Sequence, residues 1–563
     1  MREHTMQQSP HQSNANNPPS SSTPASLLAS FHQKLSIYNQ LGMHHTALFY
    51  ADKASSISPT PHHLITHARL HFSLANYRRA LHILQSNHLP SQHQTATLLA
   101  AQCYFQLNDY DACLALLGDE QPVDTAISAL TLRGAPRELH AALCVLRARV
   151  HQRLQNPHCA LMWYKRAFRC DIFCVDAFHA LANAALLPKP EAADFVRHAL
   201  SDAPSPSHAH TLATNWISSY YAASTNKHAP IPSSPPMSAN LDLTMLAALR
   251  SFDALDFPTC VHHCRAILRN DPHENTILPL YLATLVELHE HHELFITAHE
   301  LVDNAPKSAI TWLAVGYYYL ACGKPELGRR FFRKCTAMDM QIPQAWIAIG
   351  HAFAAQDESD QAMAAYRTAA RLFPGLHQPQ LFMGMEYVRQ GSLSQAVTML
   401  QHAADACATD PAPIHELGVI AYRMGDHSNA ANYFNNALRR WQAGDASREL
   451  CGTSGRRAEA EEATLVNLAH CYRRLHDYHR AKQCYQKALA LRPRSASTCG
   501  ALGMTLHAMS DLDGAIAMYH RALRSSPEDV NFSHLLERAL QDMLLMKPTG
   551  SMSLSEPSTA MSL

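Results

Sequence analysis

The sequence has few charged residues, little glycine and no excess charge of either sign. Charged side chains make up 16% of the 563 residues, and 46 Lys and Arg balance 46 Asp and Glu. A protein that binds nucleic acid over a broad surface needs a basic face, so this composition argues against a nucleic-acid partner. With only 19 glycines, a sheet with many tight turns is also disfavoured.

The sequence also lacks a signal peptide, a membrane-spanning segment and a cysteine pattern typical of disulfide bonds. The N-terminal stretch has no apolar core typical of a secretory signal. The longest strongly apolar stretch, residues 309–322, is too short to cross a bilayer. Fifteen cysteines include no CxxC pair, which favours reduced thiols over a disulfide framework. We therefore expect a soluble intracellular protein without a membrane partner.

The sequence does contain a 34-residue repeat. Small residues define the first series, with 17 residues inserted between the fourth and fifth members: Gly316, Gly350, Gly384, Gly418, Ala469 and Gly503. Two more series run in phase with it: Ala362, Ala396, Ala430, Ala481 and Ala515, and the bulky Phe332, Tyr366, Leu400, Phe434, Tyr485 and Tyr519. This period is typical of the tetratricopeptide repeat, a helix–turn–helix unit.

The repeat predicts an all-α solenoid, a superhelix of stacked helix pairs in which each repeat buries its face on the next. Small residues let the first helix (A) and the second helix (B) approach closely, and we expect the aromatic residues to fill the space between successive repeats. Trp312 and Trp346 mark equivalent positions on helix A. We interpret these tryptophans and the glycine series as repeat packing and not as a cofactor site.

The same frame divides the chain. The repeats that end at Pro272 and Pro306, and those upstream of them, are divergent, and the stretch after Pro527 predicts a C-terminal capping helix. The first half is predicted to consist of a disordered segment 1–25, an N-terminal array 26–203 and a Ser/Pro-rich linker 204–240, whose NWISSYYAAS stretch forms a short packed helix. The second half is predicted to consist of a first C-terminal array 241–440, an insertion loop 441–462, further repeats with the capping helix 463–545, and a disordered tail 546–563.

No enzyme motif is present, and the strongest metal candidate is weak. Cys260 and Cys264 lie one helical turn apart, near His262, His263 and the histidines of 289–292. Such spacing can present two metal ligands. Both cysteines occupy packing positions of their repeat, however, and 38 histidines make clusters common. We therefore predict no catalytic residue, no metal and no cofactor.

Helix A of each repeat lines the inner surface of such an array, mainly one and five residues after the tryptophan position. The candidates for a peptide groove are Leu313, Tyr317, Ile347, His351, Leu381, Met385, Val419 and His470. They include no Lys, Asn or Arg clamp for a peptide carboxylate. An apolar or charge-neutralised peptide suits this face, and packing against neighbouring helices is the open alternative.

Two Ser-Pro dipeptides in the linker, at Ser205 and Ser234, are possible phosphosites for a proline-directed kinase. Such dipeptides are also common in any Ser/Pro-rich linker.

Several blocks go beyond generic repeat packing. TLVELHEHHELFITAHELVDNAP, AWIAIGHAFAAQDESDQAMAAYRTAARLFPG and NLAHCYRRLHDYHRAKQCYQKALALRPRSAST resemble the tetratricopeptide scaffold subunit of the anaphase-promoting complex or cyclosome, the "cell division cycle sixteen" or "cut nine" class. The resemblance covers about residues 30–200 and 241–545 and is strongest over 276–440.

This resemblance implies a non-catalytic subunit of a multisubunit ubiquitin ligase that acts in mitosis, in the nucleus and cytoplasm. It implies partners among the other subunits of the complex, including other tetratricopeptide subunits, and a homodimer formed through the N-terminal repeats. It also implies that the C-terminal superhelix encloses the N-terminus of a small companion subunit whose first Met is acetylated. One rival stays open, a tetratricopeptide co-chaperone or peptide receptor. An enzyme in which repeats precede a catalytic domain is disfavoured, because too few residues lie outside the repeats to build one.

Overall fold

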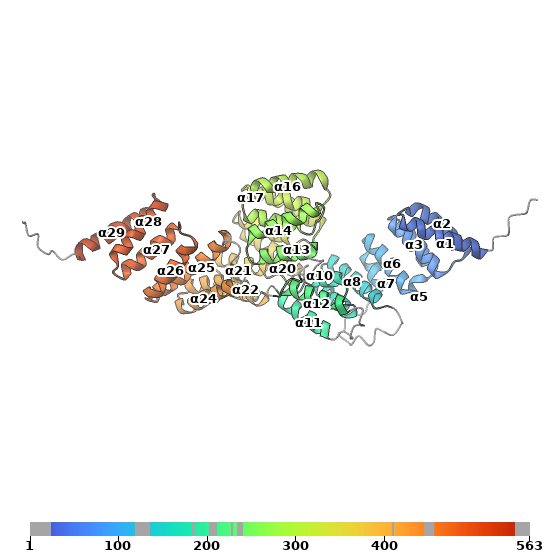
Figure 1. The fold of residues 1–563 in the computed structure, drawn as a ribbon, viewed down its shortest axis with the longest axis horizontal. Coiled ribbons are helices and arrows are strands. Elements are labelled where there is room, and N and C mark those ends of the chain that lie inside the picture. Colours follow the sequence, from blue (N-terminus) through green and yellow to red (C-terminus); the bar gives the residue numbers. More distant parts are fainter. Residues whose placement is uncertain are drawn as a thin grey trace, which may run out of the picture. The chain divides into compact units, whose positions relative to one another are not determined.

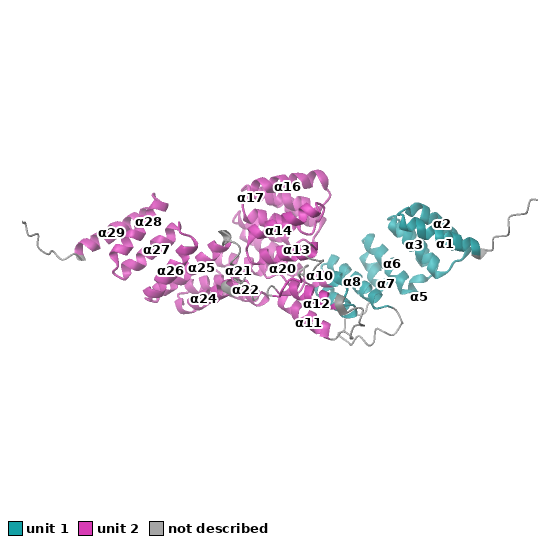
Figure 2. Cartoon of the chain, in the orientation of Figure 1, with its two compact units in different colours: residues 1–177 teal, residues 178–563 magenta. Residues whose placement is uncertain are grey.

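The computed structural model describes residues 24–118, 136–182, 186–201, 211–226, 229–232, 240–407, 410–443 and 455–546. Throughout these residues all regular secondary structure is α-helical (Figure 1). The chain forms two compact units, residues 1–177 and 178–563 (Figure 2). The all-α solenoid is confirmed. Most of the two predicted disordered ends, 1–25 and 546–563, lies outside the described residues. They overlap the structure only where the first helix begins, at Pro24, and where the last helix ends, at Met546.

Unit 1 is built from helices that each pack on the next along the chain. They are α1 (Pro24–Gln40), α2 (His44–Ile57), α3 (Pro61–Ser73), α4 (Tyr77–Ser86), α5 (Leu89–Gln92), α6 (Gln94–Gln106), α7 (Tyr110–Leu117), α8 (Arg137–Arg153) and α9 (Pro157–Cys170), with α10 (Val175–Ala182) spanning the boundary to unit 2.

Unit 2 continues the same pattern of helix pairs. Its helices are α11 (Lys189–Ser201), α12 (Thr211–Thr225), α13 (Leu241–Asp253), α14 (Phe257–Asn270), α15 (Leu278–Glu287), α16 (His291–Asn304), α17 (Ala309–Ala321), α18 (Pro325–Met338), α19 (Pro343–Ala354), α20 (Ser359–Leu372), α21 (Gln378–Arg389), α22 (Leu393–Ala406), α23 (Ala412–Arg423), α24 (His427–Ala443), α25 (Gly455–Arg474), α26 (Tyr478–Leu491), α27 (Ala496–Ala508), α28 (Leu512–Ser525) and α29 (Val530–Met546).

The turn between helix A and helix B has the same backbone conformation in repeat after repeat. One residue there has a positive φ, and from Leu255 to Gly425 and from His476 to Ser510 these residues recur with the period of the repeat. They are Gly42, Ala75, Asn108, Gln155, Leu255, His289, Gly323, Asp357, Gly391, Gly425, His476 and Ser510. A left-handed residue ends a helix while keeping its last carbonyls hydrogen-bonded. The divergent repeats, which end at Pro306, therefore have the same turn as the clear ones.

Contacts within one repeat explain why small and bulky residues recur at a constant spacing along the sequence. A Cβ added to Gly350 would lie 2.2 Å from Cε1 of Tyr366, and one added to Gly316 would lie 2.4 Å from Cε1 of Phe332. The aromatic ring of helix B thus packs directly on the glycine of its own helix A. Tyr366 also lies 5.6 Å from the ring of Phe382 in the next repeat, so the aromatic residue packs between successive repeats, as expected, and within its own repeat as well.

The other small and large positions behave in the same way. Gly384, Gly418 and Gly503 face Leu400, Phe434 and Tyr519. Trp312 stacks on Phe331 at 5.8 Å, and Trp346 donates a hydrogen bond from Nε1 to the carbonyl of Met340 at 3.2 Å. All of these positions therefore serve repeat packing.

Two predicted boundaries differ from the structure. The contact units divide after residue 177, so α11 and the linker helix α12 belong to unit 2, where Tyr221 stacks on Phe178 at 4.0 Å. The predicted insertion loop 441–462 overlaps α24 at one end and α25 at the other. Its last residues are helical because Glu462 is buried and accepts hydrogen bonds from Thr498 at 2.6 Å and Arg492 at 3.1 Å.

Helix α29 caps the array, as predicted. Phe532 packs against Gly500, where an added Cβ would lie 2.2 Å from Cε1 of the ring. Leu535 and Leu536 pack on the same core as Tyr519. The last apolar surface of the solenoid is thereby covered.

Candidate peptide groove

The eight candidate groove residues fall into two groups by accessibility. Four of them, Leu313, Tyr317, Ile347 and Leu381, are more than nine-tenths buried. Tyr317 packs edge-on against Phe332 at 5.3 Å. The other four, His351, Met385, Val419 and His470, are partly or well exposed, and Met385 is the most accessible at 42%. Only this second group presents an accessible surface in the free chain.

Two of the accessible positions are histidines held by the same local contact. Nδ1 of His351 and the hydroxyl of Tyr366 share a hydrogen bond of 2.9 Å, and Nδ1 of His470 and the hydroxyl of Tyr485 share one of 2.7 Å. The rings cross at 68° in the first pair and 70° in the second. Each tyrosine lies 15 residues after its histidine, a spacing that is visible in the sequence but that we did not interpret as a pair.

A third histidine, His415, lies one residue after the tryptophan position of its repeat. Its Nδ1 shares a hydrogen bond of 3.0 Å with the hydroxyl of Thr464, and its ring lies edge-on to Phe434 at 5.3 Å. Sequence reasoning placed it on helix A but did not select it as a candidate.

These histidines are neutral at physiological pH. Burial lowers the pKa of His351 and of His415 to about 4. For His470, burial is the main cause and the nearby Arg473 and Arg474 contribute to lowering its pKa to about 4. Desolvation disfavours the charged imidazolium, so these three side chains act as uncharged hydrogen-bonding groups.

The arginines at the end of helix A are committed to neighbouring repeats. Nη1 of Arg389 donates to the carbonyl of Ala354 at 3.0 Å, and Nη1 of Arg423 donates to the carbonyl of Val388 at 3.4 Å. Each arginine thus adds a hydrogen bond to a carbonyl at the end of the preceding helix A that already accepts a backbone N–H, from Asp357 and Gly391 respectively. They do not form a clamp for a peptide carboxylate.

Cys260 and Cys264, the metal candidates, are fully buried in the core of unit 2. Across the described ranges no group of three or more His, Cys, Asp or Glu side chains is placed to hold a metal ion. Within the same ranges no helix is both long and apolar enough to span a membrane.

The superhelix of unit 2 brings distant repeats together. Leu255, in the turn between α13 and α14, packs against the core formed by Leu438, Trp441, Leu465 and Leu468 of α24 and α25. The helices that carry the accessible candidates, α19, α21, α23 and α25, lie in the part of the chain that runs from Leu255 to this core.

Comparisons with known proteins agree with the repeat frame. The family profile described as "Anaphase-promoting complex, cyclosome, subunit 3" matches residues 40–120, and two profiles described as "Tetratricopeptide repeat" match residues 343–375 and 460–528.

The similarity to individual proteins extends over most of the chain. Anaphase-promoting complex subunit 6 of Arabidopsis thaliana is 32% identical, with 89% of this chain and 94% of the relative covered. Cell division cycle protein 16 homolog of Homo sapiens is 30% identical, over 86% of this chain and 79% of the relative. Anaphase-promoting complex subunit cut9 of Schizosaccharomyces pombe is 31% identical, over 88% and 74%.

A solved structure shares the fold. The crystal structure of the APC/C hetero-tetramer Cut9–Hcn1 contains a chain that matches 92% of this one with a TM-score of 0.69 and 31% identity, and 98% of that chain is covered. The 34-residue repeat, the family profiles and the similarity along nearly the whole chain agree: this chain belongs to the family of tetratricopeptide subunits of the anaphase-promoting complex that includes subunit 6, Cell division cycle protein 16 and cut9.

Proposed function

We propose that this chain is a non-catalytic scaffold subunit of the anaphase-promoting complex, a ubiquitin ligase that controls mitosis. It acts in the nucleus and cytoplasm and binds other subunits, including other tetratricopeptide subunits. Stacked repeats supply long surfaces for protein partners without requiring reactive side chains. The full-length similarity to subunits of this complex supports the assignment.

The helix-A surface of unit 2 holds the N-terminal segment of a small companion subunit with an acetylated first Met. The observation that carries this proposal is the uncharged character of the accessible row formed by His351, Met385, Val419 and His470. An acetylated terminus has no positive charge and would lose little hydration in such a site, whereas a free ammonium would be left unpaired. The family member Cut9 was crystallised as a hetero-tetramer with Hcn1, which is consistent with a second kind of chain bound to this fold.

The N-terminal repeats carry a homodimer interface. Large apolar side chains of α1, α2 and the turn between them are exposed: Ile37, Leu41, Met43, Phe49 and Ile57. A cluster of this kind on one pair of helices is typical of a protein interface. Its position in the first repeat supports dimerisation through unit 1.

Membership of the complex is tested by affinity purification of the tagged full-length chain from mitotic cells followed by mass spectrometry. We expect the other subunits of the ligase to be recovered. Their absence, together with recovery of chaperones, would favour the co-chaperone alternative.

The same samples test phosphorylation at Ser205 and Ser234, which lie outside the described residues; unmodified peptides would remove that proposal.

The groove is tested by Met385→Asp, which places a charge in the accessible row. We expect loss of the small companion while the larger subunits are retained. Met338→Asp is the matched control because Met338 is also 42% exposed but lies on helix B. Tyr317→Ala is a poorer test, since Tyr317 is buried against Phe332 and its loss would disturb packing. Equal retention of the companion by both Met variants would contradict the groove.

A further inference from the structure

A cavity of about 540 Å³ in unit 2 has a cysteine in its wall. Residues from α11, α12 and the end of α13 line it, among them Lys189, Arg250 and Asp253, and Cys407 lines it at the end of α22. Cys407 is partly exposed. A small solute can therefore reach the sulfur through a space that the repeats leave open.

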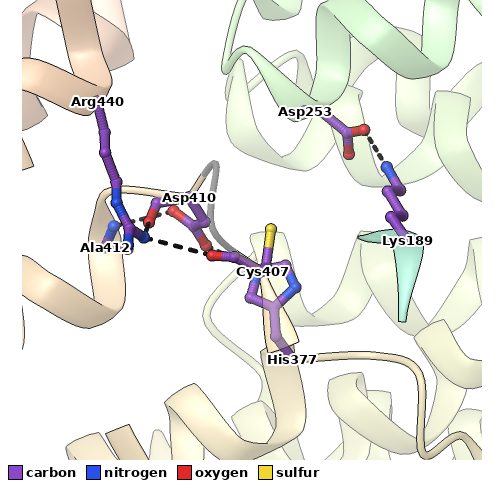
Figure 3. A network of polar contacts seen from close by, with 7 residues as sticks. All are labelled: Lys189, Asp253, His377, Cys407, Asp410, Ala412 and Arg440. Atoms are coloured by element: carbon purple, nitrogen blue, oxygen red, sulfur yellow. Dashed lines mark hydrogen bonds and ion pairs between the residues drawn. The ribbon is translucent and has the colours of Figure 1, made fainter. Parts of the chain in front are cut away.

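The Cys407 side chain is hydrogen-bonded to the imidazole of His377, at the start of α21. Both residues are labelled in Figure 3. Nε2 of the same ring is paired with Oδ2 of Asp410 at 2.8 Å. Burial alone would lower the pKa of His377, but the hydrogen bonds to Asp410 and Cys407 outweigh it and raise this pKa to about 9. The ring is therefore an imidazolium at neutral pH and favours a negative sulfur beside it.

A second cation, Lys189, lines the same cavity. Lys189 forms an ion pair with Asp253 (Figure 3). Burial opposes its charge, but Asp253 and the nearby Cys407 raise the pKa of Lys189 above its ordinary value. Lys189 thus remains an ammonium that also favours the thiolate.

Other groups around the cysteine act in both directions. Arg440 from α24 donates from Nη1 to the carbonyls of Cys407 and Asp410 at 3.4 and 2.9 Å. Asp405 and Asp410, together with the carbonyl end of α22, disfavour a negative sulfur. The direct hydrogen bond from an imidazolium and the charges of Lys189 and Arg440 oppose them.

We propose that Cys407 is a reactive thiolate, held between His377 and Lys189, and that it is the site at which hydrogen peroxide oxidises this chain. The sulfur attacks one oxygen of the peroxide, so that an S–O bond forms and the O–O bond breaks. The thiolate is oxidised by two electrons to a sulfenic acid, and the peroxide is reduced to hydroxide and the sulfenic oxygen. The adjacent imidazolium can supply the proton that converts the hydroxide to water.

Most other cysteines of the described chain provide the contrast. Cys170 is the exception, because it is partly exposed and its hydrogen bond with Cys144 lowers its pKa to about 7. Eight are buried, and burial raises the pKa of thiols such as Cys103 and Cys471 to about 12. Cys322 is exposed, and its side-chain hydrogen-bond partner is the Tyr318 hydroxyl instead of a cation. It serves as the reference for an ordinary accessible thiol.

The proposal is tested by the pH dependence of alkylation in the full-length folded chain. Iodoacetamide is applied in brief pulses between pH 6.5 and 8.0, and modification of each cysteine peptide is quantified by mass spectrometry. An ordinary thiol with a pKa of about 8.5 reacts about twentyfold faster at pH 8.0 than at pH 6.5. We expect alkylation of Cys407 to rise with pH by a much smaller factor than alkylation of the exposed Cys322.

Two variants separate the thiolate from mere accessibility. His377→Gln and Lys189→Gln should each make alkylation of Cys407 rise steeply with pH, with circular dichroism confirming unchanged helicity. Lys189 is half exposed, so its replacement leaves the core intact. In wild type, hydrogen peroxide followed by dimedone should label Cys407 before Cys322, and Cys407→Ser should remove that label. A steep pH profile at Cys407 in wild type, no reaction there, or equal peroxide labelling of the two cysteines would overturn the proposal.

Discussion

Single residues set the distance between the two helices of each repeat. Where helix A carries glycine, the ring or branched side chain of helix B occupies the place of the missing Cβ, as Tyr366 does at Gly350 and Leu400 at Gly384. Ala469 stands at the same position opposite Tyr485, and both are fully buried. The position therefore needs a small residue, and glycine allows the closest approach.

Gly350→Ala should destabilise unit 2 by about 2–3 kcal/mol, because the new methyl group would overlap the buried Tyr366 ring. The midpoint of urea denaturation would measure the loss. Gly391→Ala is the control, since its Cβ would meet nothing within 4 Å and only its φ of +80° is unfavourable. It should cost about 1 kcal/mol. Equal costs would mean that the ring moves aside freely.

The neutral histidines predict a specific loss of stability in acid. An unfolded histidine has a pKa of about 6.5, whereas those of His351 and His470 lie near 4 in the folded chain. As the pH falls from 6.5 towards 4, the unfolded chain takes up protons first, so the free energy of unfolding decreases. The loss is on the order of 1–2 kcal/mol per histidine.

Thermal unfolding at pH 7 and pH 4.5 tests this expectation. The double variant His351→Gln/His470→Gln should lose less stability between the two pH values than wild type does. His402→Gln changes an exposed histidine and should leave the difference as it is. A double variant with the wild-type pH dependence would show that these rings are not the groups that titrate.

At the scale of helices, the repeat period predicted the clear repeats and the cap, because packing positions recur in the sequence. The turns were harder to predict. Their left-handed residue is glycine at Gly323, Gly391 and Gly425, but it is His289, Asp357 or Ser510 elsewhere. Only the backbone conformation is common to these positions, so residue type reveals the turn in some repeats and hides it in others.

The capping role of α29 can be tested at one side chain. Phe532→Ala should destabilise α27 and α28 by about 2 kcal/mol, because its ring fills the space over Gly500. Amide hydrogen exchange in α27 and α28 would become faster, with little change in α19 and α20. Leu545→Ala, on the same helix but 84% exposed, should have no such effect. Unchanged exchange in Phe532→Ala would mean that the cap does not stabilise the repeats beneath it.

At the scale of the whole chain, a feature could be predicted from the sequence only when its residues occupy equivalent positions of the repeats. The candidate groove came from equivalent positions, and half of it proved to be core because helix-B aromatics such as Phe332 cover those positions. The environment of Cys407 could not be predicted. It combines Lys189, His377 and Arg440 from helices far apart in the sequence, which only the superhelical path brings together.

The exposed apolar side chains of the first repeat predict a change of assembly state. Leu41 is 65% and Phe49 59% exposed, an arrangement that is costly in water unless a partner covers it. If the chain forms the proposed homodimer, the double variant Leu41→Asp/Phe49→Asp should be a monomer in sedimentation equilibrium without loss of helicity. Leu154→Asp, an exposed apolar residue at the turn after α8, should remain dimeric. A wild-type chain that is monomeric would contradict the homodimer. A chain that stays dimeric after the double change would place the interface elsewhere than on α1 and α2.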